Sequence, residues 1–149
     1  MCSSDLEAIV SIWFQKPSLE MINGLSKGTM LETIGIEFTG IGDDYIEGTM
    51  PADDRTFQPY GLVHGGANIA LAESLGSTGG ALTLDPDKYY CVGQEVNANH
   101  LRAVRSGLVT GRAEQIYAGR TSQVWQIKLW DDQGKLSCIS RLTLAVVKK

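Results

Sequence analysis

The 149-residue sequence lacks the features that mark several protein classes. It has three cysteines, an odd number and too few for a disulfide scaffold, and only four prolines. None of its apolar runs approaches the ~20 residues of a membrane-spanning helix. With 43% hydrophobic and 20% charged residues, the composition is neither disordered nor collagen-like. We therefore expect a soluble globular chain, and its length suits a single domain of ~100–150 residues.

Positive charge is also scarce, because 13 Lys and Arg face 17 Asp and Glu, for a net charge of −4. A general nucleic-acid binder needs a positive surface that displaces counterions from phosphates, so no nucleic-acid partner is expected. The three cysteines show no C-x-x-C spacing and the chain has two histidines, which argues against a metal site. The first residues lack the basic start and apolar stretch of a signal peptide. These features predict reduced thiols in a cytoplasmic protein.

Two short helices are expected before the first strands. The i, i+3, i+4, i+7 spacing of an amphipathic helix is met by Leu6, Ile9, Val10 and Trp13. Ser18 can cap a second helix that carries apolar residues at 19, 22 and 25 and ends at Gly28. Residues 1–149 are expected to form one domain, with about 1–12 as an N-terminal helical extension.

Beyond residue 33 the apolar residues recur with a period of two. Alternation at Ile34, Ile36 and Phe38, a turn at 42–44 and the stretch 45–50 predict a β-hairpin. The segment 51–60 contains two prolines and no period, which indicates a loop. Four further strands are expected at roughly 89–99, 106–117, 122–131 and 135–147.

The segment 64–82 is expected to be the one long helix. Apart from Glu73 its residues are small or apolar on nearly every side, which is typical of a helix surrounded by protein. A strand pair, one buried helix and then four strands joined by short turns predict an α+β fold. In this fold an antiparallel sheet wraps around one long central helix.

Glu73 is the strongest chemical signal, because it is the only charged residue between Arg55 and Asp85. Ionised carboxylates almost never enter a core unpaired, since desolvation costs several kcal/mol. One interpretation is a structural glutamate bonded to a backbone group or to an arginine. The other is a desolvated carboxylate that serves as general base or nucleophile, and the pattern favours it.

His64 and Gly65 stand where this helix should begin. Free amides at a helix N-terminus can hold a developing oxyanion, or else His64 only caps the helix and the glycines only permit packing. Nine residues separate His64 from Glu73, which is ~13.5 Å along a helix. The two residues therefore cannot serve one reacting atom within one chain. An active-site interpretation predicts an oligomer whose sites are shared between subunits.

The local charge reverses between residues 100 and 120, where Glu114 is the only acidic residue. The basic side chains there are His100, Arg102, Arg105, Arg112 and Arg120. A patch of this size suits the phosphates of a small anionic ligand, or it is the charged edge of a solvated strand. The turn 119–122 offers amides and hydroxyls that could also bind phosphate.

Four motifs occur in a specific order: Gln-Pro-Tyr-Gly-Leu-Val-His-Gly-Gly at 58–66, Leu-Ala-Glu-Ser at 71–74, Asn-Ala-Asn-His-Leu-Arg at 97–102 and Gln-Val-Trp-Gln at 123–126. With this set, the chain from about Trp13 to Val147 resembles the hotdog-fold acyl-CoA thioesterases of the phenylacetate and 4-hydroxybenzoyl-CoA type. The resemblance implies a homo-oligomer, dimer or tetramer, that hydrolyses an acyl-CoA to free acid and coenzyme A. It implies an aromatic substrate, such as the 1,4-dihydroxy-2-naphthoyl-CoA of menaquinone biosynthesis or a benzoyl-CoA, and no cofactor, metal or membrane partner.

The resemblance also implies a role for each matching residue. Glu73 would be the catalytic carboxylate, as nucleophile or as the base that activates water. The N–H of Gly65 would polarise the thioester carbonyl with Gln58 and His64 nearby, and Ser77 would position the water or the acyl group. The coenzyme A arm and phosphates would be held by Gly93, His100, Arg102, Arg105, Gly119, Arg120, Thr121 and Ser122.

Two other functions stay open at this point. Proofreading thioesterases that act on aryl groups bound to a carrier protein share these motifs. A non-catalytic acyl-CoA-binding module could use the same fold. Glu73 favours an enzyme over the module, because a pure binder gains nothing from burying a carboxylate beside a thioester carbonyl.

Overall fold

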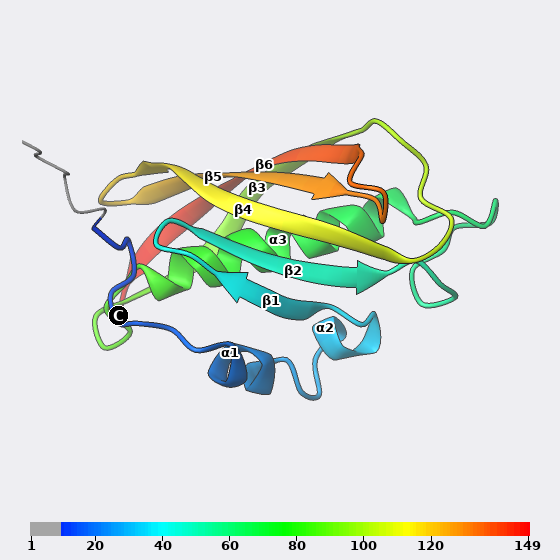
Figure 1. Ribbon diagram of the computed structural model, residues 1–149. Coiled ribbons are helices and arrows are strands. Elements are labelled where there is room, and N and C mark those ends of the chain that lie inside the picture. Colours follow the sequence, from blue (N-terminus) through cyan, green and yellow to red (C-terminus); the bar gives the residue numbers. More distant parts are fainter. Residues whose placement is uncertain (1–9) are drawn as a thin grey trace, which may run out of the picture.

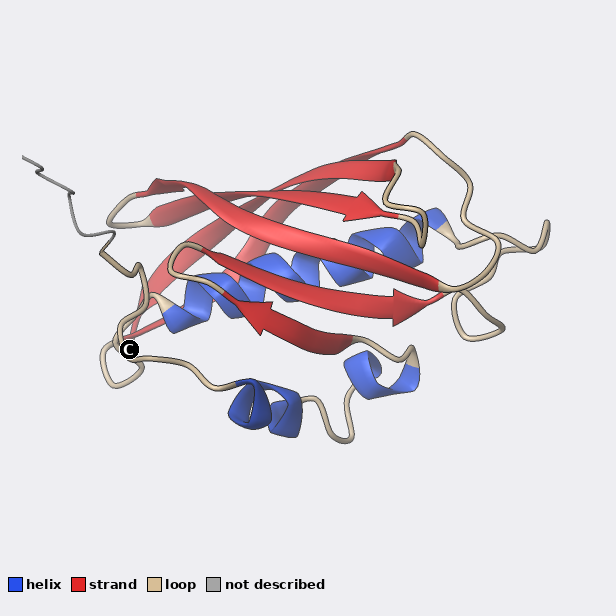
Figure 2. Cartoon of the chain, in the orientation of Figure 1, coloured by secondary structure: helices blue, strands red, loops and turns tan. Residues whose placement is uncertain are grey.

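One antiparallel six-stranded sheet wraps around one long helix in the computed structural model, which describes residues 10–149 (Figures 1 and 2). The long helix is α3 (Gly65–Leu82). The strands are β1 (Glu37–Ile41), β2 (Tyr45–Pro51), β3 (Tyr89–His100), β4 (Leu108–Ala118), β5 (Ser122–Trp130) and β6 (Leu136–Lys148). Their order across the sheet is β1-β2-β4-β5-β6-β3. The expected α+β hotdog fold is confirmed, and the four later strands begin and end within two residues of their predicted bounds.

The N-terminal segment differs in part from expectation. The predicted helix at 6–13 falls partly on residues outside the described range, and Val10–Trp13 form no helix. Trp13 instead joins the core: its indole N–H donates to the Gly42 carbonyl (2.7 Å), and its ring stacks on Trp125 with centroids 6.5 Å apart. These tertiary contacts replace the helical conformation that the apolar spacing alone predicts.

Two short helices precede the sheet. α1 (Leu19–Leu25) begins as expected after Ser18, whose hydroxyl accepts the Met21 N–H, but it ends three residues before Gly28. A second helix, α2 (Met30–Thr33), was not predicted. It forms because the Thr29 hydroxyl caps it, accepting the Leu31 N–H. The first strand therefore begins at Glu37, three residues later than the predicted start.

The core lies between α3 and the concave face of the sheet. Leu71, Ala72 and Leu75 of the helix are fully buried, Leu71 and Leu75 lie beside Gly111 of β4, and the helix also packs closely on β5 and β6. Gly79 allows this close approach, because a Cβ there would lie 2.8 Å from the Trp125 ring. The residues on the opposite side of α3 are only half-buried in one chain. The fold of a single subunit thus leaves part of the apolar pattern of this helix unexplained.

The two edges of the sheet differ. At β1, the Asn23 side chain of α1 donates to the Phe38 carbonyl and accepts the Phe38 N–H, both at 2.9 Å, in place of a neighbouring strand. At the other edge, β3 pairs with β6 alone among the described strands, and Val92 to Glu95 are exposed. A long exposed edge strand invites pairing with another chain.

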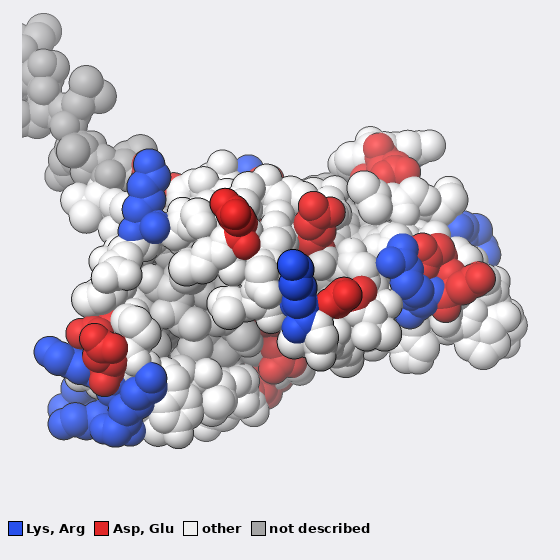
Figure 3. All heavy atoms as spheres, turned by 90° about the horizontal axis from the view of Figure 1, so that it is seen from below, with Lys and Arg blue, Asp and Glu red and all other residues white. Residues whose placement is uncertain are grey.

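The surface carries both signs of charge. On the face seen in Figure 3, Lys and Arg lie near Asp and Glu, with uncharged surface between them and no continuous basic field. Within residues 10–149, no helix combines the length and apolar character that crossing a membrane would require.

Candidate functional site

The start of α3 carries a backbone amide with no acceptor. The His64 side chain caps the helix, with Nδ1 accepting the Gly66 N–H at 2.7 Å, and the backbone N–H of His64 donates to the Thr56 carbonyl at 2.7 Å. The capping role considered for His64 is thus present. The hydrogen bonds among residues 10–149 leave the Gly65 N–H free. This N–H lies at the positive end of an 18-residue helix, where an anionic oxygen is stabilised.

A cavity of about 330 Å³ opens beside this helix start. Four residues expected from the sequence line it: Gln58 from the loop before α3, Gly65 from the helix, His100 from the end of β3 and Arg102 from the following loop. Gln58 and His100, 42 positions apart in the chain, therefore meet at one end of the molecule, because β3 runs back along α3 (Figure 1).

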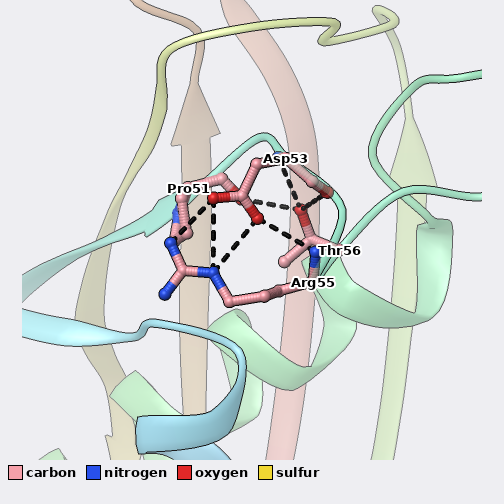
Figure 4. Close-up of polar contacts among 4 residues, drawn as sticks. All are labelled: Pro51, Asp53, Arg55 and Thr56. Atoms are coloured by element: carbon pink, nitrogen blue, oxygen red, sulfur yellow. Dashed lines mark hydrogen bonds and ion pairs between the residues drawn. The ribbon is translucent and has the colours of Figure 1, made fainter.

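A polar cluster holds the loop that leads to Gln58 (Figure 4). The Asp53 carboxylate accepts the Arg55 N–H at 3.0 Å and the guanidinium Nη2 at 2.7 Å. The hydrogen bonds from the Arg55 guanidinium lower the pKa of Asp53 below its usual value. The Thr56 hydroxyl donates to the Pro51 carbonyl at 2.7 Å, which closes the turn.

The orientation of the Gln58 side chain follows from the next turn. Its Oε1 accepts the Tyr60 N–H, and the backbone N–H of Gln58 donates to the Leu62 carbonyl at 2.8 Å. Because the amide oxygen is occupied, the amide nitrogen of Gln58 is left as a hydrogen-bond donor at the cavity.

The His100 ring lies directly against Gly65. A Cβ at Gly65 would lie 2.8 Å from His100 Nε2, so only glycine admits the ring here. Asn68 also lines this cavity, with Nδ2 3.5 Å from His100 Nδ1. Sequence reasoning missed Asn68, although the signal that singled out Glu73 applies to it too: a polar side chain in an otherwise small and apolar helix.

Glu73 lies eight residues beyond Gly65, on the side of α3 that faces β3. A Cβ at Gly93 would collide with its Oε1, so the carboxylate rests against the β3 backbone. The register of β3 shifts at this point, between Gly93 and Glu95. Glu73 is half-buried, and residues 10–149 supply no hydrogen bond or ion pair to it. The structural interpretation, which required a backbone or arginine partner, finds none in the described part of the chain.

Ser77 belongs to the same group of residues as Glu73 and Gly93. It follows Glu73 by one helical turn, and its carbonyl oxygen lies 3.7 Å from the Cys91 thiol of β3. Burial raises the pKa of that thiol. Glu73 and Gly65 are about 12 Å apart along the helix axis, at 1.5 Å per residue. One chain therefore carries two separate groups of candidate site residues, one around Gly65 and one around Glu73, which we call half-sites.

The residues expected to hold phosphate do not form one cluster in a single chain. Arg102 and Arg105 are exposed near the start of α3, where Arg105 Nη1 lies 3.5 Å from the Tyr60 carbonyl. The turn 119–122 lies at the opposite end, where the Gly119 N–H donates to the Ser122 carbonyl at 2.8 Å and the Thr121 carbonyl accepts the Val146 N–H at 2.9 Å (Figure 1). The two groups are separated by roughly the 27 Å length of α3.

Arg112 is not free to bind a ligand. Its Nε donates to Glu47 Oε1 at 2.6 Å, and its guanidinium lies 3.9 Å above the Tyr45 ring. Glu47 and Arg112 are directly opposite each other on β2 and β4. β4 lies between β2 and β5, so Arg112 is on the face of an interior strand and not at the sheet edge that the alternative interpretation of the basic patch expected.

Within residues 10–149, no three His, Cys, Asp or Glu side chains lie close enough together to hold a metal ion. The thiol of Cys138 is buried, and burial raises its pKa to about 11. At neutral pH this thiol is protonated, so it is a poor metal ligand and a poor nucleophile.

The known proteins similar to this chain that we compare are named as thioesterases or as an acyl-CoA hydrolase. Residues 60–138 match the profile of the Thioesterase superfamily. The proofreading thioesterase EntH of Cronobacter turicensis is 50% identical over 136 residues, or 91% of this chain and 98% of that protein. The 1,4-dihydroxy-2-naphthoyl-CoA hydrolase of Escherichia coli is 47% identical over 136 residues, or 91% and 99% of the two chains. The crystal structure of a mutant thioesterase from Pseudomonas aeruginosa has a TM-score of 0.92 and 52% identity, covering 93% of this chain and 100% of that one.

Proposed function

Because this chain belongs to the thioesterase superfamily and is a thioester hydrolase, we propose that its substrate is an aromatic acyl-CoA. 1,4-Dihydroxy-2-naphthoyl-CoA and benzoyl-CoA are the compounds to test first. The similarity to a hydrolase of the former supports this choice and a place in menaquinone biosynthesis. The main structural support for thioester hydrolysis is the free Gly65 N–H beside a cavity, in a chain that also presents an unpaired carboxylate at Glu73.

Gly65 supplies the electrophilic half of the mechanism. When a thioester carbonyl is attacked, its oxygen gains negative charge. The Gly65 N–H and the dipole of α3 stabilise that oxygen, and the Gln58 amide adds a further donor. One preorganised donor of this kind contributes on the order of 10²–10³-fold to kcat.

Glu73 supplies the other half. As a general base it takes a proton from water, the hydroxide adds to the carbonyl carbon, and the C–S bond breaks to release the coenzyme A thiolate, which is then protonated. As a nucleophile its carboxylate oxygen adds to the carbonyl carbon, and the C–S bond breaks to release the coenzyme A thiolate, which is protonated. Water then hydrolyses the acyl-enzyme anhydride to the free acid and the Glu73 carboxylate. Both routes need an ionised carboxylate with no bound cation, and the described residues place no cation on Glu73. Ser77, one turn on, is positioned to hold the water in either route.

The site requires two subunits, because Glu73 and Gly65 of one chain are about 12 Å apart. In our proposal, two copies pair antiparallel along their β3 edges. This contact would place the N-terminal half of one α3 beside the C-terminal half of the other, so that Glu73 of the partner subunit meets Gly65. The open β3 edge, the covered β1 edge and the half-buried side of α3 support this arrangement. A tetramer would be a pair of such dimers.

The same arrangement would assemble the coenzyme A site. It would bring the partner's turn 119–122 to the end of the molecule that carries His100, Arg102 and Arg105. Arginine side chains and turn amides are suited to phosphate. The exposure of Arg102 and Arg105 supports this role.

A carrier-protein substrate is the second candidate, favoured by the 50% identity to a proofreading thioesterase. The same half-sites would then act on an aryl group attached to the phosphopantetheine of a carrier protein. The non-catalytic binding module loses its support, because the relatives are named thioesterase and hydrolase.

Thiol release tests the proposal. Benzoyl-CoA, 1,4-dihydroxy-2-naphthoyl-CoA, a medium-chain acyl-CoA and an aryl-loaded carrier protein would be compared. Turnover should favour the aromatic CoA esters and fall by 10³-fold or more in Glu73→Gln, while the exposed control Glu20→Gln keeps wild-type activity. Because a thiol-reactive dye also reports the protein's own cysteines, each variant with dye but without substrate sets its own background. Preference for the medium chain or the carrier protein would overturn the substrate, and a fully active Glu73→Gln would overturn the mechanism.

A further inference from the structure

Asn68 is the one polar side chain of the cavity at the start of α3 to which the proposed function gives no task. It is the fourth residue of the helix and only 4% exposed. Its Oδ1 is buried and has no hydrogen-bond partner within residues 10–149. A buried carbonyl without a hydrogen bond destabilises the fold, whereas a leucine of similar volume would carry no such cost. Packing alone therefore does not account for an amide at this position.

The amide faces His100. Asn68 Nδ2 lies 3.5 Å from His100 Nδ1, and an amide nitrogen can only donate. With the amide in this orientation, the imidazole nitrogen accepts through its lone pair, and a neutral ring then carries its proton on Nε2. The distance is long for a hydrogen bond, as is common in unliganded sites, where such contacts shorten when substrate binds.

Nε2 is the ring atom of His100 closest to the position of a Cβ on Gly65, at 2.8 Å, against 3.2 Å and 3.3 Å for its ring neighbours. Among the hydrogen bonds of residues 10–149, His100 Nε2 has no partner, and neither has the Gly65 N–H. The Nε2 edge of the imidazole thus lies against Gly65 at the cavity.

We propose that Asn68 is a positioning residue that acts through His100. It holds the imidazole so that the Nε2–H lies beside the Gly65 N–H and both donate to the thioester carbonyl oxygen. His100 is then a catalytic residue at the reacting group, not a ligand of the coenzyme A phosphates. This inference rests on the proposed thioester hydrolysis in the same cavity.

A truncated substrate separates the two roles of His100. The variants Asn68→Leu, His100→Ala and the double variant would be assayed on benzoyl-CoA and on the benzoyl thioester of N-acetylcysteamine, which lacks the phosphates. Each single change should lower kcat about 10–100-fold on both substrates with little change in KM. The double variant should be no slower than His100→Ala, since Asn68 acts only through that ring. Gln133→Leu, an exposed amide in the β5–β6 turn, is the matched control and should behave as wild type.

Two kinetic outcomes would overturn the inference. A loss confined to KM and to the CoA ester would return His100 to the phosphates. A loss that multiplies in the double variant would show that Asn68 acts independently of His100. Circular dichroism and thermal unfolding of each variant identify any that fail to fold.

The position of the ring proton gives a readout that needs no turnover. The chain has two histidines, so ¹⁵N spectra of the imidazoles are simple, and a His64→Gln sample assigns them. His100 should carry its proton on Nε2 in the wild type and on Nδ1 in Asn68→Asp, because a carboxylate accepts where the amide donates. A wild-type protein that hydrolyses thioesters with the proton on Nδ1 overturns this inference alone. A wild-type protein that hydrolyses no thioester overturns the proposed function as well.

Discussion

Gly93 and Glu73 depend on each other, since the Glu73 carboxylate occupies the space that a side chain at residue 93 would need. In Gly93→Ala the new methyl group would displace Oε1, which is the flexible end of its side chain. We therefore expect kcat to fall 10-fold or more while the free energy of unfolding changes by less than about 1 kcal/mol. Thiol-release kinetics and urea unfolding measure the two quantities.

The control for that substitution is Gly24→Ala, where nothing lies within 4 Å of the added Cβ. It removes a glycine from α1 and should leave turnover unchanged while stabilising the fold by about 0.5–1 kcal/mol. Full activity in Gly93→Ala would show that the resting place of the carboxylate on β3 has no part in the reaction.

At the scale of single residues, residue type and order predicted several of the residues that line the cavity at the start of α3. Gln58, Gly65, His100 and Arg102 were selected from the sequence, and they line one cavity. Asn68 was missed because a single amide in a helix is an ordinary residue until its neighbour across space is known. The contact between His100 and Gly65 was equally hidden, since 35 residues of chain separate them.

Among the elements, the loop before Gln58 is held by the ion pair of Asp53 and Arg55, which makes its contribution to stability pH-dependent. The folded-state pKa of Asp53 is lowered by Arg55. The contribution is therefore fully present above the unfolded pKa of ~3.9 and is lost as the pH falls through the folded value.

Urea unfolding at pH 7 and pH 3 tests this linkage. Asp53→Asn should lower the unfolding midpoint at pH 7 and have a smaller effect at pH 3, because pH 3 lies below the unfolded pKa of ~3.9 and part of the contribution is lost there. Asp54→Asn, the adjacent exposed carboxylate, controls for the loss of one negative charge. An equal effect of Asp53→Asn at both pH values would remove the ion pair as the cause.

α1 stabilises the β1 edge through one side chain. Asn23→Ala removes both hydrogen bonds to Phe38, whose backbone groups then lie at an edge with no partner. The free energy of unfolding should fall by about 1–3 kcal/mol. Calorimetry and urea titration measure this loss, with exposed Gln15→Ala as the control. A change below a few tenths of a kcal/mol would mean that water replaces the amide without cost.

The helices before the sheet show where local pattern fails. Ser18 predicted the start of α1 because a capping hydroxyl is a local signal. The non-helical path at Trp13 depends on its contact with Trp125, which no sequence window contains. α2 has a local cap at Thr29, which the sequence reasoning overlooked. The later strands were predicted closely because each combines a period of two with a defined turn.

For the whole molecule, the proposed dimer makes Val92 a test position. It is 48% exposed on the open edge strand β3. Val92→Lys places a charge on each side of the proposed contact, where lysine discourages strand pairing. Sedimentation should show more monomer than in the wild type, and turnover should fall with the fraction of dimer.

Thr39→Lys, on the covered edge strand β1, is the matched control and should sediment as wild type. A Val92→Lys monomer with full activity would contradict a site shared between subunits. The prediction of a site shared between subunits followed from the sequence alone, because the spacing of His64 and Glu73 on one helix fixes their separation. Which edge is open did not follow from it, since that depends on the Asn23 side chain.

The unequal edges also limit how far these chains can polymerise. A sheet with two open edges can add strands at both sides and grow into a filament. Here one side is capped by Asn23 within each chain. Pairing along β3 about a two-fold axis would use the open β3 edge of both copies. The β1 strands, each bonded to Asn23, would then lie at the two ends of the joined sheet. A concentrated solution of this protein should therefore stop at a finite particle, and the side chain that ensures this lies on the opposite edge of the sheet from the contact.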